Sequence, residues 1–256
     1  MQTTWSAMTV RFEELTLHYQ PQYFADGSRM AAVEALLRVL KPTPRLMRPG
    51  DVLAHFSDPA DAERLDYWVF RRACADAVAW PGLTVSINLS ADRFRDPVLV
   101  DRLVAICDEV GIGHDRVEIE IVESAYIGDF DAALATIERL RAVGFRIALD
   151  DFGTGYSSLS YLLRLPVDKL KIDKCFIDDI GSMRAVAIVQ SVIALARALG
   201  LRVTAEGVET EAQRRFLKAA GCHYLQGWLF SKAVAPEEIG HLLAAERPAV
   251  PVRPPA

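Results

Sequence analysis

The sequence predicts an α/β protein in which short strands alternate with longer helices. Apolar strand patterns occur at Thr84–Asn88, Val117–Ile121 and Arg202–Ala205, and a segment with helical periodicity precedes each of them. Such alternation is typical of a parallel sheet. The length of 256 residues suits a single barrel of eight strand–helix units. We therefore expect a modified TIM (β/α)8 barrel. An open doubly wound sheet is the alternative, weakened because no G-x-G-x-x-G motif follows the first strand.

The first two expected strands, Leu15–Gln20 and Met30–Leu37, are separated by a turn at Asp26-Gly27. A connection this short joins antiparallel neighbours, so we expect the first strand to run antiparallel to the second. The segment that follows, Lys41–Pro59, is rich in proline and is expected to be irregular.

The other elements follow from periodicity and from glycines at helix ends. Helices are expected at Asp61–Ala79, Pro97–Val110, Phe130–Val143, Met183–Leu199, Glu211–Ala220 and Pro236–Ala245, with a short helix after Tyr156. Further strands are expected at Arg146–Leu149, Val167–Ile172 and His223–Gln226. We expect residues 1–246 to form one domain and the proline-rich residues 247–256 to be a disordered tail.

Composition narrows the class of protein. Hydrophobic residues make up 51% and charged residues 25%, which is an ordinary globular balance. The net charge of −5 argues against binding of a nucleic-acid polymer, and we find no membrane-spanning segment and no signal peptide. The cysteines, Cys74, Cys107, Cys175 and Cys222, lack metal-ligand spacing. We interpret them as reduced core thiols of a cytoplasmic protein.

Two adjacent acids, Asp150 and Asp151, follow the strand at Arg146–Leu149. Neighbouring side chains on a strand point to opposite faces, so both acids can enter one pocket only where the strand ends. Two close carboxylates repel each other unless a cation lies between them, and this favours a divalent metal ion. The alternative is a solvated loop in which an aspartate caps the next helix.

Polar residues also end most of the other expected strands. In a barrel these ends meet at one mouth, where active sites lie. The residues are Glu34, Asn88, Glu120, Asp150, Asp151, Lys171, Glu206 and Gln226. Five carboxylates against one lysine leave a formal charge of −4, which requires cations. Oxygen ligands favour Mg²⁺ or Mn²⁺, and two ions bridged by Asp150 would activate water for attack on a phosphodiester.

Several ordered motifs have a familiar form. They are EALLR at Glu34–Arg38, NLS at Asn88–Ser90, DDFGTGYSS at Asp150–Ser158, KID at Lys171–Asp173, AEGVE at Ala205–Glu209, and QG at Gln226-Gly227. Together they closely resemble the EAL domain family of cyclic di-GMP phosphodiesterases, from about Leu15 to Ala233. The resemblance implies a modified (β/α)8 barrel with an antiparallel first strand. It also implies bacterial second-messenger signalling, through metal-dependent hydrolysis of cyclic di-GMP to linear 5′-pGpG.

The resemblance also implies roles for individual residues. The first of two Mg²⁺ or Mn²⁺ ions would be held by Glu34, Asn88, Glu120 and Asp150, and the second by Asp150 and Asp151. The catalytic group would comprise Lys171, Glu206, Gln226 and Asp151. Substrate contacts would come from Gln20, Arg38 and Asp173. Glu123 would fasten the DDFGTG loop, and Glu209 would be a partner of Lys171.

The chain departs from the family pattern at Val39, where a tryptophan is usual, and over the segment up to Asp66. These departures leave a second hypothesis open, a catalytically weak or inactive EAL domain that acts as a cyclic di-GMP receptor or a protein-interaction module. A third hypothesis is an unrelated barrel enzyme that acts on another phosphate ester. The family often dimerises, so we expect a homodimer, and a separate sensory or regulatory protein would supply any input signal.

Overall fold

The computed structural model describes residues 10–40, 52, 54–122, 130–153 and 162–246. In this part of the chain, strands β1 to β8 form a closed barrel in sequence order. The strands are β1 (Leu15–Phe24), β2 (Met30–Val39), β3 (Thr84–Asn88), β4 (Val117–Val122), β5 (Arg146–Phe152), β6 (Lys169–Ile172), β7 (Arg202–Ala205) and β8 (Tyr224–Gln226). The expected eight-stranded barrel is therefore confirmed.

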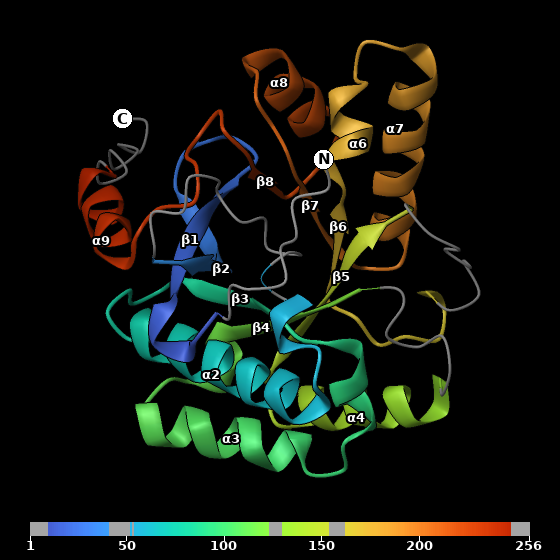
Figure 1. The fold of residues 1–256 in the computed structure, drawn as a ribbon. Helices are drawn as coiled ribbons and strands as arrows, with labels where there is room; N and C mark the ends of the chain where they lie inside the picture. Colours follow the sequence, from blue (N-terminus) through green and yellow to red (C-terminus); the bar gives the residue numbers. More distant parts are fainter. Residues whose placement is uncertain (1–9, 41–51, 53, 123–129, 154–161, 247–256) are drawn as a thin grey trace, which may run out of the picture.

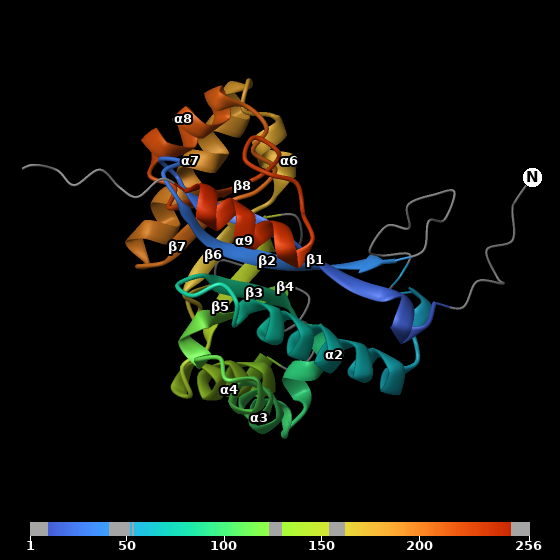
Figure 2. The same ribbon diagram turned by 90° about the vertical axis from the view of Figure 1, so that its left-hand side faces the viewer.

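Strand β1 runs antiparallel to both of its neighbours, β2 and β8, and every other neighbouring pair is parallel. This confirms the antiparallel first strand. Both strands of the hairpin are longer than the sequence predicted, and Figure 2 shows the hairpin reaching past the rest of the barrel. Glu34 consequently lies in the middle of β2 rather than at its end. It still reaches the barrel mouth because β3 to β8 are shorter than β2.

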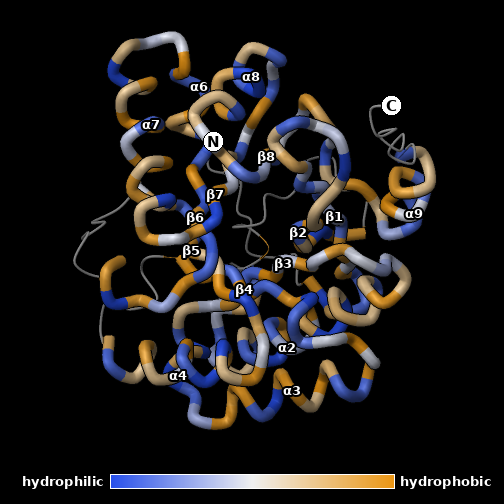
Figure 3. Tube along the Cα trace, turned by 180° about the vertical axis from the view of Figure 1, so that it is seen from behind, coloured by the Kyte–Doolittle hydropathy of each residue, from blue (hydrophilic) through white to orange (hydrophobic). Residues whose placement is uncertain are grey.

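Helices cover the outside of the barrel. Helices α2, α3 and α4 lie on one side, α6, α7 and α8 lie on the other, and α9 lies beside β1 (Figure 1). Their bounds are α2 Pro59–Ala77, α3 Leu99–Val110, α4 Phe130–Ala142, α6 Lys174–Asp178, α7 Met183–Ala198, α8 Glu211–Ala220 and α9 Pro236–Ala245. Hydrophobic and hydrophilic residues alternate along α2, α3 and α4, as one buried face requires (Figure 3). The short helix α6 was not predicted from the sequence.

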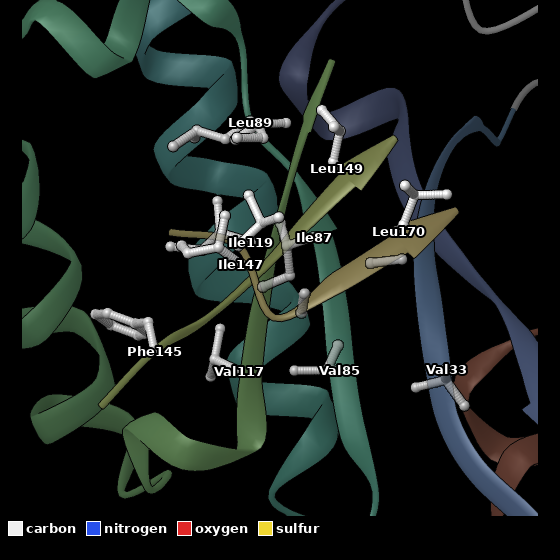
Figure 4. Close-up of a cluster of buried hydrophobic side chains, with 14 of the residues drawn as sticks. Val33, Val85, Ile87, Leu89, Val117, Ile119, Phe145, Ile147, Leu149 and Leu170 are labelled. Carbon is white, nitrogen blue, oxygen red and sulfur yellow. The ribbon is translucent and has the colours of Figure 1, made fainter. Parts of the chain in front are cut away.

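The strands place apolar and polar side chains on opposite faces. In β4, Val117, Ile119 and Ile121 belong to the hydrophobic core, and the same face of the neighbouring strands supplies most of the side chains labelled in Figure 4. The intervening residues Glu118 and Glu120 are also buried but point to the other face, into the barrel. Most barrels of this type are filled by branched apolar side chains. Here the interior layers contain buried charges.

Strand β5 continues to Phe152, so it does not end at the acidic pair. Its pairing with β6 passes from Leu149–Leu170 to Phe152–Ile172, which is three steps on β5 against two on β6. The extra residue is a bulge, and Asp151 has a left-handed backbone with φ of 54°. Because the bulge interrupts the alternation of faces, two consecutive aspartates can serve one site before the strand ends.

One sequence-based prediction is wrong, and several others concern residues outside the described ranges. Cys74, Cys107 and Cys222 are buried free thiols, but Cys175 is exposed and is not a core residue. The predicted helix after Tyr156, Glu123, most of the proline-rich segment after Leu40, and the tail 247–256 lie outside the described residues. Within the described part of the chain, no helix has both the length and the apolar character needed to cross a membrane.

Candidate active site

The amine of Lys171 lies at the centre of the acidic residues inside the barrel mouth. Its Nζ is 2.7 Å from a carboxylate oxygen of Glu120 and 2.7 Å from one of Glu206. The corresponding distances to Asp150 and Glu34 are 3.1 and 3.7 Å. The lysine side chain is only 1% exposed. Four carboxylates from β2, β4, β5 and the end of β7 thus meet at one buried cation. The sequence predicted that these acids would lie in one mouth, but not that they would surround the lysine.

Glu34 links this group to the neighbouring amides. Its Oε1 accepts a hydrogen bond from Asn88 Nδ2 at 3.0 Å, and its Oε2 accepts one from Gln226 Nε2 at 2.5 Å. Gln226 also donates to Gln20 Oε1 at 3.2 Å. Strand pairing explains the arrangement, because Gln20 lies opposite Glu34 in the β1–β2 ladder and β8 closes the barrel against β1.

A second group of carboxylates lies at the bulge in β5. Oxygen atoms of Asp150, Asp151 and Glu206 all lie within 4.8 Å of one another. Asp150 belongs to both groups, because it also contacts Lys171. Its Oδ1 accepts the backbone N–H of Asp151 at 2.9 Å, which fixes the two residues relative to each other. Asp150 therefore belongs to both groups of side chains, and its role as a bridging metal ligand stays a prediction.

Burial and mutual repulsion shift the pKa values in this site. Burial raises the pKa of Glu206 to about 8, although Lys171 acts in the opposite direction. Burial also raises the pKa of Glu120 well above its usual value, and burial followed by the charge of Asp150 raises that of Asp151. Burial opposes the charge of Lys171, but the surrounding carboxylates, Glu120 first, raise its pKa well above the usual range. Without metal, the site therefore holds protons at neutral pH.

Glycines position Glu206 beside this cluster. Gly207 has a left-handed backbone with φ of 67°, and an added Cβ would lie 2.3 Å from the Lys174 side chain. A Cβ on Gly227 would lie 2.1 Å from the carbonyl oxygen of Val208. Val208 N–H in turn donates to Gln226 O at 3.0 Å. The AEGVE and QG motifs thus pack backbone against backbone, and only glycine fits at position 227.

The predicted substrate-binding residues surround the site. Arg38 lies four residues beyond Glu34 on the same face of β2, is half-buried and donates to Leu37 O at 2.8 Å. Gln20 donates to Ser231 O at 3.2 Å. Asp173 caps α6 by accepting from Cys175 N–H at 2.9 Å, and its charge contributes to the raised pKa of Asp151. Their roles in binding stay predictions.

Two residues expected to support the site have different outcomes. Glu209 is not a partner of Lys171, because its Oε1 is 2.6 Å from Lys174 Nζ. The physical reason is the turn at Gly207, which brings the loop against the Lys174 side chain. Glu123 lies outside the described residues, and its proposed contact with the DDFGTG loop stays a prediction.

The sequence analysis missed a second charged layer. Lys169 Nζ is 2.7 Å from Glu118 Oε1, and this oxygen also accepts a hydrogen bond from the Ser86 hydroxyl at 2.7 Å. Both charged side chains are almost completely buried. The layer could have been found from strand alternation, since Glu118 precedes Glu120 by two residues and Lys169 precedes Lys171 by two. Glu118 and Lys169 were missed because neither residue lies at the end of an expected strand.

The donor set fits a hard divalent cation. Glu120 Oε1 is buried without a hydrogen-bond donor in the described part of the chain, although carboxylate oxygens so placed normally have one. It lies in the same cluster as Asp150, through their common contact with Lys171. Buried carboxylates and an amide, with neither histidine nor thiolate among them, are ligands typical of Mg²⁺, Mn²⁺ or Ca²⁺.

Fold and site together define a barrel protein whose acidic mouth is organised by a buried lysine. A model of the EAL domain family matches residues 6–233. Cyclic di-GMP phosphodiesterase NbdA of Pseudomonas aeruginosa is 38% identical over 244 residues, which cover 93% of this chain and 31% of that protein. The chain belongs to the EAL domain family.

Solved structures give the same result. The PaMucR phosphodiesterase in its c-di-GMP complex is 39% identical, with a TM-score of 0.83 over 89% of this chain and 94% of that one. The manganese/cy-diGMP complex of Klebsiella pneumoniae BlrP1 is 31% identical, with a TM-score of 0.78 over 89% of this chain and 58% of that one. The chain spans between 27% and 34% of the length of the first curated relatives.

The close packing at Gly227 predicts the effect of one methyl group. Gly227→Ala forces the 206–208 segment away from β8, and we expect a loss of about 1–3 kcal/mol in the free energy of unfolding, as for other overpacked sites. Gly181→Ala is the matched control, because nothing lies within 4 Å of its added Cβ. Urea denaturation measures both variants. Equal stabilities would contradict the backbone contact.

The raised pKa of Glu206 predicts how the stability of the metal-free protein depends on pH. The folded protein binds a proton more tightly than the unfolded chain, so this stabilisation is complete below about pH 4.5 and is lost as the pH rises toward 8. We expect the free energy of unfolding in EDTA to fall between pH 5 and 8, with a slope of up to about 1.4 kcal/mol per pH unit for each proton.

Glu206→Gln removes this ionisable group and should flatten the slope. The exposed variant Glu237→Gln serves as the control and should keep the wild-type slope. A Glu206→Gln protein with the wild-type pH dependence would show that Glu206 does not hold the proton.

Proposed function

We propose that this protein is a cyclic di-GMP phosphodiesterase that produces linear 5′-pGpG with the help of two divalent ions. The observation that carries the proposal is the convergence of Glu34, Glu120, Asp150 and Glu206 on one buried lysine. The relative named as a cyclic di-GMP phosphodiesterase, and the similar structures solved in complex with cyclic di-GMP, support the substrate.

The reaction is hydrolysis of one phosphodiester bond. The oxygen of a water molecule forms a new bond to phosphorus, and the bond from phosphorus to the ribose 3′-oxygen breaks. One proton of the water ends on that 3′-oxygen, which leaves as a hydroxyl. Opening one of the two diester links of the ring gives a linear dinucleotide with a 5′-phosphate. Water alone is consumed, and no electrons are transferred.

The residues that would hold the ions are those that the resemblance implied. Glu34, Asn88, Glu120 and Asp150 would hold one ion, and Asp150 and Asp151 the other. When bound, Mg²⁺ or Mn²⁺ would lower the pKa of water and neutralise charge on the phosphoryl oxygens. The buried Glu120 oxygen without a donor, and the close carboxylates at the β5 bulge, support this assignment.

The remaining groups would orient the reactants. Lys171 stays protonated at neutral pH and can donate hydrogen bonds to the attacking water or to the leaving oxygen. Glu206, held 2.7 Å from Lys171, can accept a proton or a hydrogen bond from the water. Gln226 fixes Glu34 and so keeps that ligand oriented. Arg38 can bind a phosphate through its guanidinium group, whose paired donors match two phosphate oxygens.

The proposed role of Glu34 gives a direct test of activity. We expect the wild-type protein with Mn²⁺ to convert cyclic di-GMP to pGpG. Chromatography of the nucleotides measures this conversion. Glu34→Ala should lower turnover by more than about 100-fold, because even outer partners of metal ligands contribute about 10–100-fold. Glu211→Ala, an exposed change on α8, should keep wild-type turnover.

Two results would contradict the proposal. Near-normal turnover by Glu34→Ala would exclude its role as a ligand. A wild-type protein that binds cyclic di-GMP in Mn²⁺ without forming product would favour the receptor hypothesis. The expected homodimer, the cytoplasmic location and a separate regulatory protein stay predictions.

A further inference from the structure

The barrel has a second opening at the end opposite the acidic mouth. A cavity of about 760 Å³ lies there, and its lining includes the first residues of several parallel strands together with Phe24, the last residue of the antiparallel β1. Examples are Thr84 at the start of β3, Arg146 at the start of β5 and Arg202 at the start of β7. The volume lies within the range of small-molecule binding sites.

The lining of this cavity is positively charged, although the whole chain has a net charge of −5. Its charged residues are Arg29, Arg141, Arg146, Lys169, Arg202, Glu118 and Asp168. These are five cations and two anions, a formal excess of three positive charges. A low-dielectric cavity strengthens the field of such an excess and attracts anions.

The two acids in the lining are already paired. Glu118 forms its ion pair with Lys169 at 2.7 Å. The Asp168 carboxylate accepts hydrogen bonds from Arg141 Nη2 at 2.8 Å and from the backbone N–H of Ile147 at 2.9 Å. The ion pairs within the lining use Arg141 and Lys169. Among the described residues, the other three guanidinium groups of the lining, those of Arg29, Arg146 and Arg202, form no ion pair with a carboxylate. Their donors remain available to a ligand.

Arg146 and Arg202 both lie on the inner face of the barrel, because of their positions in the strand pairing. Arg146 pairs in register with Glu118, and Arg202 pairs in register with Lys169. Directly paired residues on neighbouring strands project from the same face of a sheet, so both arginines share the inner face with the buried ion pair. Beneath them, Gln22 is completely buried, and its Nε2 has no acceptor within the described residues. The arginines therefore place hydrogen-bond donors on the cavity wall, and Gln22 lies next to the lining residue Lys169, whose Nζ donates to Gln22 Oε1 at 3.4 Å.

Aromatic rings lie beside these donors. The rings of Phe24 and Tyr224 both line the cavity, with centroids 5.4 Å apart. The Arg29 guanidinium lies 4.4 Å from the Phe24 ring, and Lys169 Nζ lies 5.0 Å from the Tyr224 ring. A flat base could pack against an aromatic surface while its phosphate reaches the arginines.

We propose that this cavity binds a nucleotide with a terminal phosphate. A terminal phosphate carries about −1.5 to −2 charges at neutral pH, which suits three unpaired guanidinium groups better than the single charge of a diester. Arginine pairs also match phosphate oxygens in geometry. This site lies at the opposite end of the barrel from the acidic mouth and does not depend on the phosphodiesterase activity.

Calorimetry in EDTA tests the proposal, because without metal ions the acidic mouth repels phosphate. We expect 5′-GMP to bind the protein of residues 1–256 saturably at one site. Arg146→Gln combined with Arg202→Gln should raise its Kd by at least 10-fold. Arg184→Gln, an exposed change at the start of α7, is the matched control and should leave the Kd unchanged. Thermal unfolding confirms that the variants fold.

Two smaller probes define which part of the ligand is recognised. Guanosine should bind at least 10-fold more weakly than 5′-GMP, and inorganic phosphate should also bind more weakly. Absence of 5′-GMP binding would overturn the proposal, as would a Kd that the double variant does not change. Equal affinity for guanosine would exclude phosphate recognition, and equal affinity for inorganic phosphate would exclude the nucleotide.

Discussion

The contact between one buried ammonium group and its ring of carboxylates determines much of this structure. Lys171 is surrounded by acids from four strands or strand ends. Removal of either partner from a buried ion pair leaves a charge uncompensated, which typically costs about 3–5 kcal/mol. Because the lysine neutralises only part of the acidic charge, the remaining oxygens retain protons or recruit cations. The same imbalance thus explains the raised pKa values and the suitability of the site for metal ions.

Two local devices allow the fold to hold this charge. The bulge in β5 turns Asp151 toward the mouth beside Asp150, which regular alternation would prevent. The close backbone packing at Gly227 keeps Glu206 near the lysine. Below this level, the Lys169–Glu118 pair fills the barrel with a balanced charge rather than an apolar layer. The interior thus changes from excess negative charge at one end to excess positive charge at the other.

The fold and the convergence of the acidic residues at one mouth could be predicted from the sequence, because strand alternation and ordered motifs are local signals. Lys171 and its carboxylates each follow such a pattern. The bulge could not be predicted, since it depends on the register between β5 and β6. The pairing of Glu209 with Lys174 was also missed, because it depends on how the turn at Gly207 meets helix α6. The positive cavity combines strand starts far apart in the chain, which no single motif records.

Anomalous diffraction from crystals soaked in Mn²⁺ tests the central claim most directly. The account predicts manganese peaks within coordination distance of the Asp150 and Asp151 carboxylates, and loss of these peaks in the Asp150→Asn variant. Peaks confined to other surfaces, in crystals of a protein that still hydrolyses cyclic di-GMP, would contradict it.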